Sequence, residues 1–101
     1  MKTLSKAETA KVLNTLKSNY RKSYSGMKTD ELKNLFEIWE EGLKKVDATY
    51  IFQALDWYTY EYTGDFAPTI GQFLAKANEY RAEYERKHPV IRNAWETRID
   101  G

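Results

Sequence analysis

The side chains that most often carry chemistry are sparse in this sequence and form no catalytic pattern. His88 is the single histidine and stands directly before a proline, and the chain has no cysteine. A metal site would need a second histidine or a thiolate, and neither is present. The serine and threonine hydroxyls lack the base that would activate a nucleophile. We therefore expect no catalytic residue, no metal and no cofactor, and we predict that the protein is not an enzyme.

Carboxylates at helical spacing are the remaining candidates for chemistry. Glu37/Glu41 and Glu79/Glu83 are four residues apart, which places each pair on one face of a helix. A solvated polar face has the same spacing, and no histidine accompanies either pair as a di-metal motif requires. The glycines do not form the Gly-x-x-x-x-Gly-Lys-Ser/Thr loop that cradles phosphates. We interpret both pairs as solvent-exposed and expect no nucleotide hydrolysis.

The elements that would position these residues are helices. Between Asp30 and Lys45 the apolar residues recur at the period of one helix face, at Leu32, Leu35, Phe36, Trp39 and Leu43. The stripe is roughly 100° wide at about 100° per residue, as expected of a helix packed on a core. We predict that this helix is the centre of the fold and that the other helices pack on its Trp39 stripe.

Capping patterns mark the other helices. Ser5 and Thr69 open the patterns S-x-x-E and T-x-x-Q, which predict helix starts. Thr29 and Asp47 are the expected N-caps of the second and third helices, and Gly26 is suited to a positive φ in the preceding turn. The predicted fold is all-α: a compact four-helix domain over residues 1–88 and a C-terminal tail, 89–101, that could form a short fifth helix.

The third predicted helix, from Ala48 to about Tyr62, carries aromatic residues on two sides. Its core face is Ile51, Phe52, Leu55, Tyr58 and Tyr62. Tyr50, Trp57 and Tyr60 fall within roughly 80° of one another on the opposite face, at about 100° per residue. This second face is either covered by a neighbouring helix or exposed to a partner.

Two further expectations concern burial and binding. Phe66 is expected in the core, and the fourth helix is expected to bury its apolar face, at Ile70, Phe73, Ala77, Tyr80 and Tyr84. Because Trp, Tyr and Arg most often anchor interfaces, the partner-binding residues are predicted to be Tyr50, Trp57, Tyr60, Arg92, Trp95 and Arg98.

Charge is distributed unevenly although the net charge is only +1. Residues 1–28 carry seven bases and one acid, whereas residues 29–65 carry nine acids and three bases. Either a basic helix packs beside an acidic one and their fields cancel, or two faces serve two partners. The acidic central third weighs against direct nucleic-acid binding as the main role. No segment has the length and hydropathy of a signal peptide or membrane span, so we expect a cytoplasmic protein and no membrane partner.

Short motifs within these helices share their order and spacing with a known family. They are Leu16-Lys17-x-x-Tyr20, Trp39 with Leu43 and Asp47, the pair Ala54-Leu55, and Phe66-x-Pro68-Thr69-Ile70. Over about residues 5–75 the chain resembles the small replicative-helicase loader and inhibitor proteins of phages that infect Gram-positive bacteria.

The resemblance implies a non-enzymatic phage DNA-replication protein with an all-α N-terminal domain and no ATPase fold. Its expected partner is a hexameric DnaB-type replicative helicase, which it inhibits and helps to load at the origin together with an origin-binding protein. In such proteins the segment beyond the folded domain is implicated in helicase contact, which corresponds here to the region after Tyr84. Two alternatives stay open: a small phage protein on the same scaffold that inhibits another host protein, and a DNA-binding accessory protein.

Overall fold

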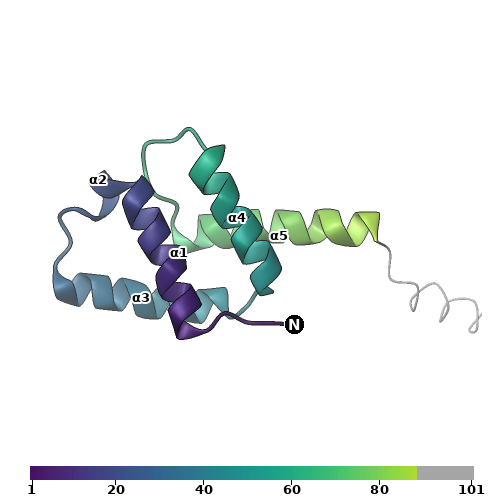
Figure 1. Ribbon diagram of the computed structural model, residues 1–101, viewed down its shortest axis with the longest axis horizontal. Coiled ribbons are helices and arrows are strands. Elements are labelled where there is room, and N and C mark those ends of the chain that lie inside the picture. Colours follow the sequence, from purple (N-terminus) through teal and green to yellow (C-terminus); the bar gives the residue numbers. More distant parts are fainter. Residues whose placement is uncertain (89–101) are drawn as a thin grey trace, which may run out of the picture.

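The computed structural model describes residues 1–88. These residues form helices and no strand, which confirms the all-α prediction (Figure 1). The elements are α1 (Lys6–Asn19), α2 (Arg21–Tyr24), α3 (Thr29–Leu43), α4 (Ala48–Tyr60) and α5 (Ile70–Lys87). The four long helices are those expected, and α2 is a single extra turn. The predicted tail, 89–101, lies outside the described residues.

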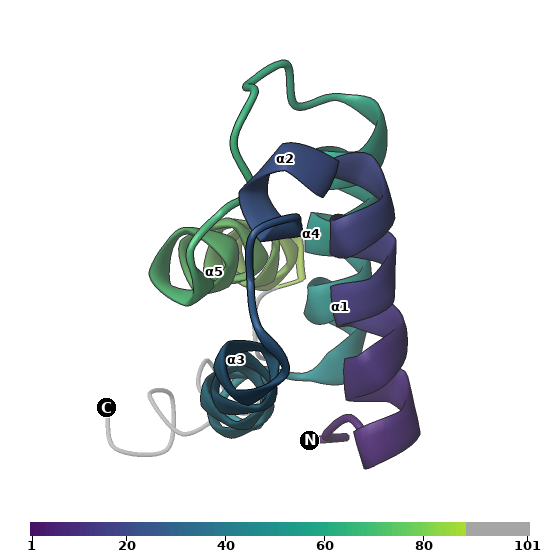
Figure 2. The same ribbon diagram turned by 90° about the vertical axis from the view of Figure 1, so that its left-hand side faces the viewer.

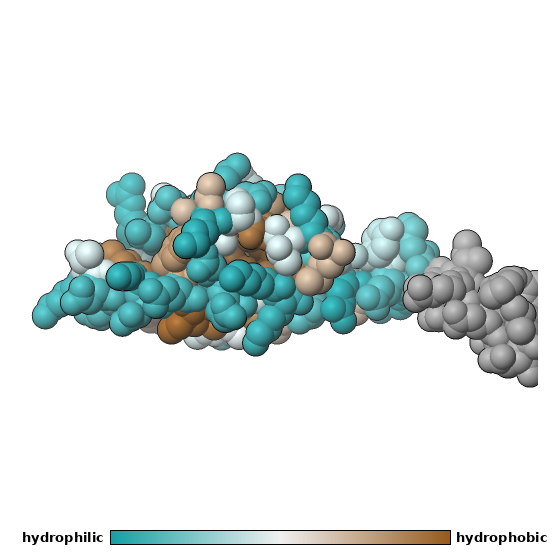
Figure 3. Space-filling model, turned by 90° about the horizontal axis from the view of Figure 1, so that it is seen from below, coloured by the Kyte–Doolittle hydropathy of each residue, from teal (hydrophilic) through white to brown (hydrophobic). Residues whose placement is uncertain are grey.

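The centre of the fold is α4 and not α3, so the prediction of a central α3 was wrong. Figure 2 shows α1 and α5 on opposite sides of α4, while α3 lies at the base and contacts α1 and α5. The reason is the distribution of apolar residues. The residues Ile51, Ala54 and Leu55 point to more than one neighbour and are all buried, whereas α3 has one apolar face and turns its polar face outward. Seen from below, the side of α3 is largely hydrophilic with separate hydrophobic patches (Figure 3).

The core is closed by one large aromatic contact between α3 and α5. The rings of Trp39 and Phe73 meet edge to face with their centroids 5.2 Å apart, and both side chains are buried. Burying a side chain of this size contributes about 2–3 kcal/mol. Gly42 lies one turn along α3, where an added Cβ would be 2.7 Å from Cγ1 of Ile70. The glycine thus allows the start of α5 to approach α3 closely.

The helix starts follow the predicted caps at three of four positions. The hydroxyls of Ser5 and Thr69 accept backbone N–H groups at 3.1 Å, and the Asp47 carboxylate accepts the amide of Thr49 at 2.8 Å. The expected cap at Thr29 was wrong by one residue, because helix α3 already includes Thr29.

The turn before α3 also differs from the prediction. The carboxylate of Glu31 accepts the backbone N–H of Lys28 at 3.4 Å, so this helix start is satisfied from within its first turn. Gly26 does not adopt a positive φ. Helix α2 and the bond from the Met27 amide to the Tyr24 carbonyl, at 3.2 Å, turn the chain instead.

The connection between α4 and α5 corrects two expected burials. Helix α4 ends at Tyr60, so Tyr62 lies beyond it. Phe66, expected in the core, is 76% exposed. The following residue, Ala67, donates its amide to the Ser23 hydroxyl at 2.9 Å, which fixes the connection against α2. The chain is therefore held by its backbone, and the Phe66 side chain points outward.

Candidate protein-binding groove

An aromatic groove follows the contact between α4 and α5. Three neighbouring hollows of about 550, 270 and 290 Å³ make up the groove, and Gln53 lines all three. The residues that define this aromatic groove are Tyr50, Trp57, Tyr60, Tyr80 and Tyr84. Because α4 supplies three of them and α5 two, the groove exists only when the two helices are packed together.

The ring contacts hold part of this groove rigid. The centroids of Tyr50 and Tyr84 are 6.2 Å apart. The Lys76 ammonium lies 4.0 Å from the Trp57 ring centroid and 5.3 Å from that of Tyr80. Cation–π contacts of this length contribute about 0.5–1 kcal/mol at exposed sites. A half-buried indole fixed in this way is a preorganised contact for a partner.

The phenol groups in the groove are neutral hydrogen-bond donors at physiological pH. Partial burial raises the pKa of Tyr50, and the neighbouring Tyr84 and Asp47 add to the shift. Burial also raises the pKa of Tyr80, with Glu61 as the next cause. The groove therefore offers aromatic faces and protonated hydroxyls beside carboxylates.

The predicted site residues are only partly brought together. Tyr50, Trp57 and Tyr60 lie along the one groove, and both alternatives for this face hold in part. Tyr50 and Trp57 are half-buried against α5, while Tyr60 is 82% exposed. Their contact with a partner stays a prediction. The other three predicted residues, Arg92, Trp95 and Arg98, lie outside the described residues.

Sequence reasoning missed the α5 wall of the groove. Tyr80 and Tyr84 were expected in the core, but Tyr80 is half-buried and Tyr84 is exposed. The signal was present, because helical spacing from the buried Ala77 turns both tyrosines away from the centre of the core face. It could be used only once α5 was known to pack beside the aromatic side of α4.

The candidate chemical residues lie in structural roles. The His88 ring stacks on Tyr84, with centroids 4.2 Å apart, and its Nδ1 is 3.1 Å from the Tyr84 carbonyl oxygen at the end of α5. Glu83 pairs with Lys87 at 2.9 Å. Within residues 1–88 no group of three potential metal ligands comes together. No helix in that range has the length and hydrophobicity needed to cross a membrane.

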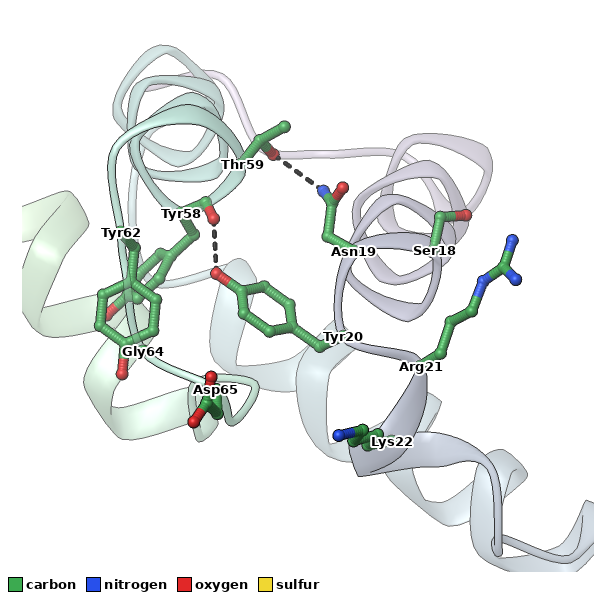
Figure 4. A pocket seen from close by; sticks show the side chains of 10 residues that line it. All are labelled: Ser18, Asn19, Tyr20, Arg21, Lys22, Tyr58, Thr59, Tyr62, Gly64 and Asp65. Carbon is green, nitrogen blue, oxygen red and sulfur yellow. Dashed lines mark hydrogen bonds between the residues drawn. The ribbon is translucent and has the colours of Figure 1, made fainter.

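A second hollow, of about 450 Å³, lies on the other side of α4, between the ends of α1 and α4 (Figure 4). Tyr62 and Gly64 form one side of it, and Arg21 and Lys22 form the other. At its base the Tyr20 hydroxyl donates to the backbone carbonyl of Tyr58. We call this hollow the α1–α4 pocket.

A small all-helical domain with an aromatic groove, and no metal cluster among residues 1–88, is a binding protein in its architecture. Over residues 4–74 the sequence matches the family model for the N-terminal domain of gp39, the phage SPP1 protein that typifies a helicase loader and inhibitor family. The chain therefore belongs to this family of phage helicase loader and inhibitor proteins, which is not a known enzyme family. No curated protein and no solved structure matches the chain.

Proposed function

We propose that the protein binds a hexameric DnaB-type replicative helicase, inhibits it, and assists its loading at the origin with an origin-binding protein. The observation that carries the proposal is the family match over residues 4–74. Those residues include α1 to α4 and the first five residues of α5. The proposed activity takes place in the cytoplasm of the infected cell.

The proposed mechanism is occupancy and needs no reaction. A protein that binds one state of the helicase more tightly than another shifts the population toward the favoured state by its differential affinity. A shift from 1:99 to 99:1 requires about 5.5 kcal/mol of such preference. A hexamer offers several equivalent sites, so a small domain can reach this sum from modest contacts at each site.

We place the helicase contact on the aromatic groove and on the segment after residue 88. This treats residues 1–88 as the folded domain and 89–101 as a tail. Tyr60 supports the assignment because its ring is 82% exposed, and an exposed aromatic side chain at the mouth of a groove is typical of an interface anchor. In the tail, Arg92, Trp95 and Arg98 are the proposed contacts.

Size-exclusion chromatography with a purified helicase hexamer tests the proposal. The wild-type chain should co-elute with the hexamer and lower its ATPase and unwinding rates. Tyr60→Ala and Trp95→Ala should each weaken binding by about 30-fold, the equivalent of ~2 kcal/mol for a true anchor. Phe66→Ala is the matched control, because Phe66 is 76% exposed but lies outside the groove.

The two parts of the proposal can fail separately. If the hexamer never co-elutes with the wild-type chain, this family scaffold serves a different partner here. If it co-elutes but Tyr60→Ala and Phe66→Ala behave alike, the aromatic groove is not the contact surface. Inhibition without any gain in loading on origin DNA would remove the loading part alone.

A further inference from the structure

A strip of exposed bases forms the side of the molecule opposite α5. Helix α1 occupies that side, with α4 between it and α5 (Figure 2). The residues of this basic strip are Lys6, Lys11, Lys17, Arg21 and Lys22, all exposed except the half-buried Lys17. The only acid on α1 is Glu8, whose carboxylate accepts the Ser5 amide at 3.0 Å in the capping box.

The charge of this strip is not neutralised by the rest of residues 1–88. All ion pairs in that range join residues three or four apart near the end of α3 or on α5. Helices α1 and α3 do pack together, but no pair crosses between them. The cancelling of fields that the sequence allowed is therefore not achieved through ion pairs, and the strip keeps a positive potential.

The strip is also concave. Helical geometry places Lys11 along one edge of the outer face of α1 and Lys6 and Lys17 along the other. Small residues between these edges form a shallow hollow of about 380 Å³, which shares Ser18 with the α1–α4 pocket. The two hollows give a continuous track that ends beside Arg21, about 22 Å from Lys6 at ~1.5 Å per residue.

The composition of the track favours nucleic acid over protein. None of the large apolar side chains exposed in residues 1–88 lies on α1, whereas the core of a protein interface is rich in aromatic and apolar residues. Lysines with interleaved hydroxyl and amide side chains, here Asn14, Thr15 and Ser18, are typical of contacts to a phosphate backbone.

The α1–α4 pocket favours a single strand over a duplex. The Tyr62 ring is 37% exposed and lies across the pocket from Arg21 and Lys22 (Figure 4). Gly64 makes room for this ring, because a Cβ at Gly64 would collide with it. A volume of about 450 Å³ accepts an unstacked base. Aromatic side chains beside a positively charged groove are the usual platform for single-stranded nucleic acid.

We propose that this face binds single-stranded nucleic acid without sequence specificity. The basic strip contacts successive phosphates, and one base enters the α1–α4 pocket against Tyr62. The sequence weighed against such binding because of the acidic central third. The structure separates the charges: α3 lies at the base of the molecule, away from the outer face of α1 (Figure 2). This inference does not depend on the helicase proposal, because its test contains no helicase.

Fluorescence anisotropy with a labelled oligo(dT) of about 20 nucleotides tests the strip. For about four phosphate contacts, log K should fall against log salt with a slope of about −3 between ~25 and ~200 mM NaCl. The triple change Lys11→Gln, Arg21→Gln and Lys22→Gln should weaken binding at least tenfold and reduce the slope by about 2. The matched control, Lys33→Gln, Lys44→Gln and Lys45→Gln, changes net charge equally at α3 and should cost less than twofold.

The pocket is tested with Tyr62→Leu, which keeps an apolar side chain but removes the stacking face. It should weaken oligo(dT) binding about tenfold and leave duplex binding unchanged, while Phe66→Leu should change neither. Thermal unfolding of each variant confirms that it is folded at the assay temperature. The wild-type salt slope and the wild-type preference for single strand over duplex need no variant at all.

Several outcomes would overturn the inference. Wild-type protein that binds no oligo(dT) at ~25 mM NaCl, or equal losses in the two triple variants, would remove the strip as a nucleic-acid site. Duplex bound as tightly as single strand would remove the pocket's role. Displacement of oligo(dT) by poly-glutamate at equal charge concentration would assign the face to an acidic protein instead.

Discussion

Replacing Tyr20 by phenylalanine removes the single oxygen atom that caps the end of α4. The Tyr20 hydroxyl donates to the carbonyl of Tyr58, and the Tyr20 ring is only 7% exposed. The amide that would ordinarily reach this carbonyl in a helix belongs to Tyr62, but it donates to the Trp57 carbonyl at 2.9 Å. Within residues 1–88 the Tyr58 carbonyl therefore has no backbone donor, and the phenol supplies its hydrogen bond.

The magnitude follows from this arrangement. Phenylalanine keeps the ring, so packing is unchanged and the loss is that of one buried hydrogen bond. A buried acceptor left without a partner costs about 1–3 kcal/mol, and we expect about 2 kcal/mol for Tyr20→Phe. For a domain of this size each kcal/mol lowers the melting temperature by about 4–8 °C, so the expected decrease is about 8–16 °C.

Urea and thermal unfolding followed by circular dichroism measure this change. Tyr58→Phe is an informative comparison, because the Tyr58 hydroxyl donates to the Gln72 carbonyl at a longer 3.2 Å. That carbonyl lies inside α5 and can also accept a helix amide, so its loss should cost less than ~1 kcal/mol. Tyr24→Phe removes a hydroxyl with no hydrogen bond within residues 1–88 and should be near neutral. A Tyr20→Phe loss no larger than that of Tyr24→Phe would refute the capping role.

Three further changes have opposite expectations from place to place. Gly42→Ala should destabilise by about 1–2 kcal/mol in urea unfolding, because its Cβ would lie 2.7 Å from Ile70 and the clash outweighs a helix-propensity gain of ~1 kcal/mol. Gly26→Ala has nothing within 4 Å and should be neutral or stabilising; equal losses at both glycines would contradict the close approach of α5. Two backbone N–H groups hold the pKa of Asp47 below its ordinary 3.8, so its contribution to stability is present above that value and is lost as the pH falls through the folded pKa. Asp47→Asn should therefore be less stable than wild type near neutral pH, and the difference should close in acid; a gap that persists at low pH would show that charge is not the cause. Phe66→Ala should leave stability within about 0.5 kcal/mol, and a larger loss would place its ring in the core after all.

The parts of the fold that sequence reasoning predicted are those set by local interactions. The capping boxes at Ser5 and Thr69 involve residues three apart, so the sequence contains all of the geometry. The buried face of α3 follows from its period alone. The central position of α4 depends on which helices cover it, and that is a property of the packed chain. Phe66 was misassigned for the same reason, since its direction is set by the bond between Ala67 and Ser23.

The candidate groove was predictable by half. A helical wheel collects Tyr50, Trp57 and Tyr60 on one side of α4 without any tertiary information. Tyr80 and Tyr84 join them only through the packing of α5, which brings the Tyr50 and Tyr84 rings within 6.2 Å. The α1–α4 pocket could not be predicted in this way, because it needs the end of α1 beside the chain that follows α4.

The family match and the groove have different boundaries, and this bears on specificity. The match ends at residue 74, whereas Tyr80 and Tyr84 lie further along α5. One wall of the aromatic groove thus belongs to the family domain, and the other lies beyond the matched residues. The shared scaffold accounts for the packing of Trp39 and Phe73, which any member needs in order to fold. Recognition that uses both walls therefore depends on the second half of α5. Changes at Tyr80 and Tyr84 should alter partner choice while leaving the core intact.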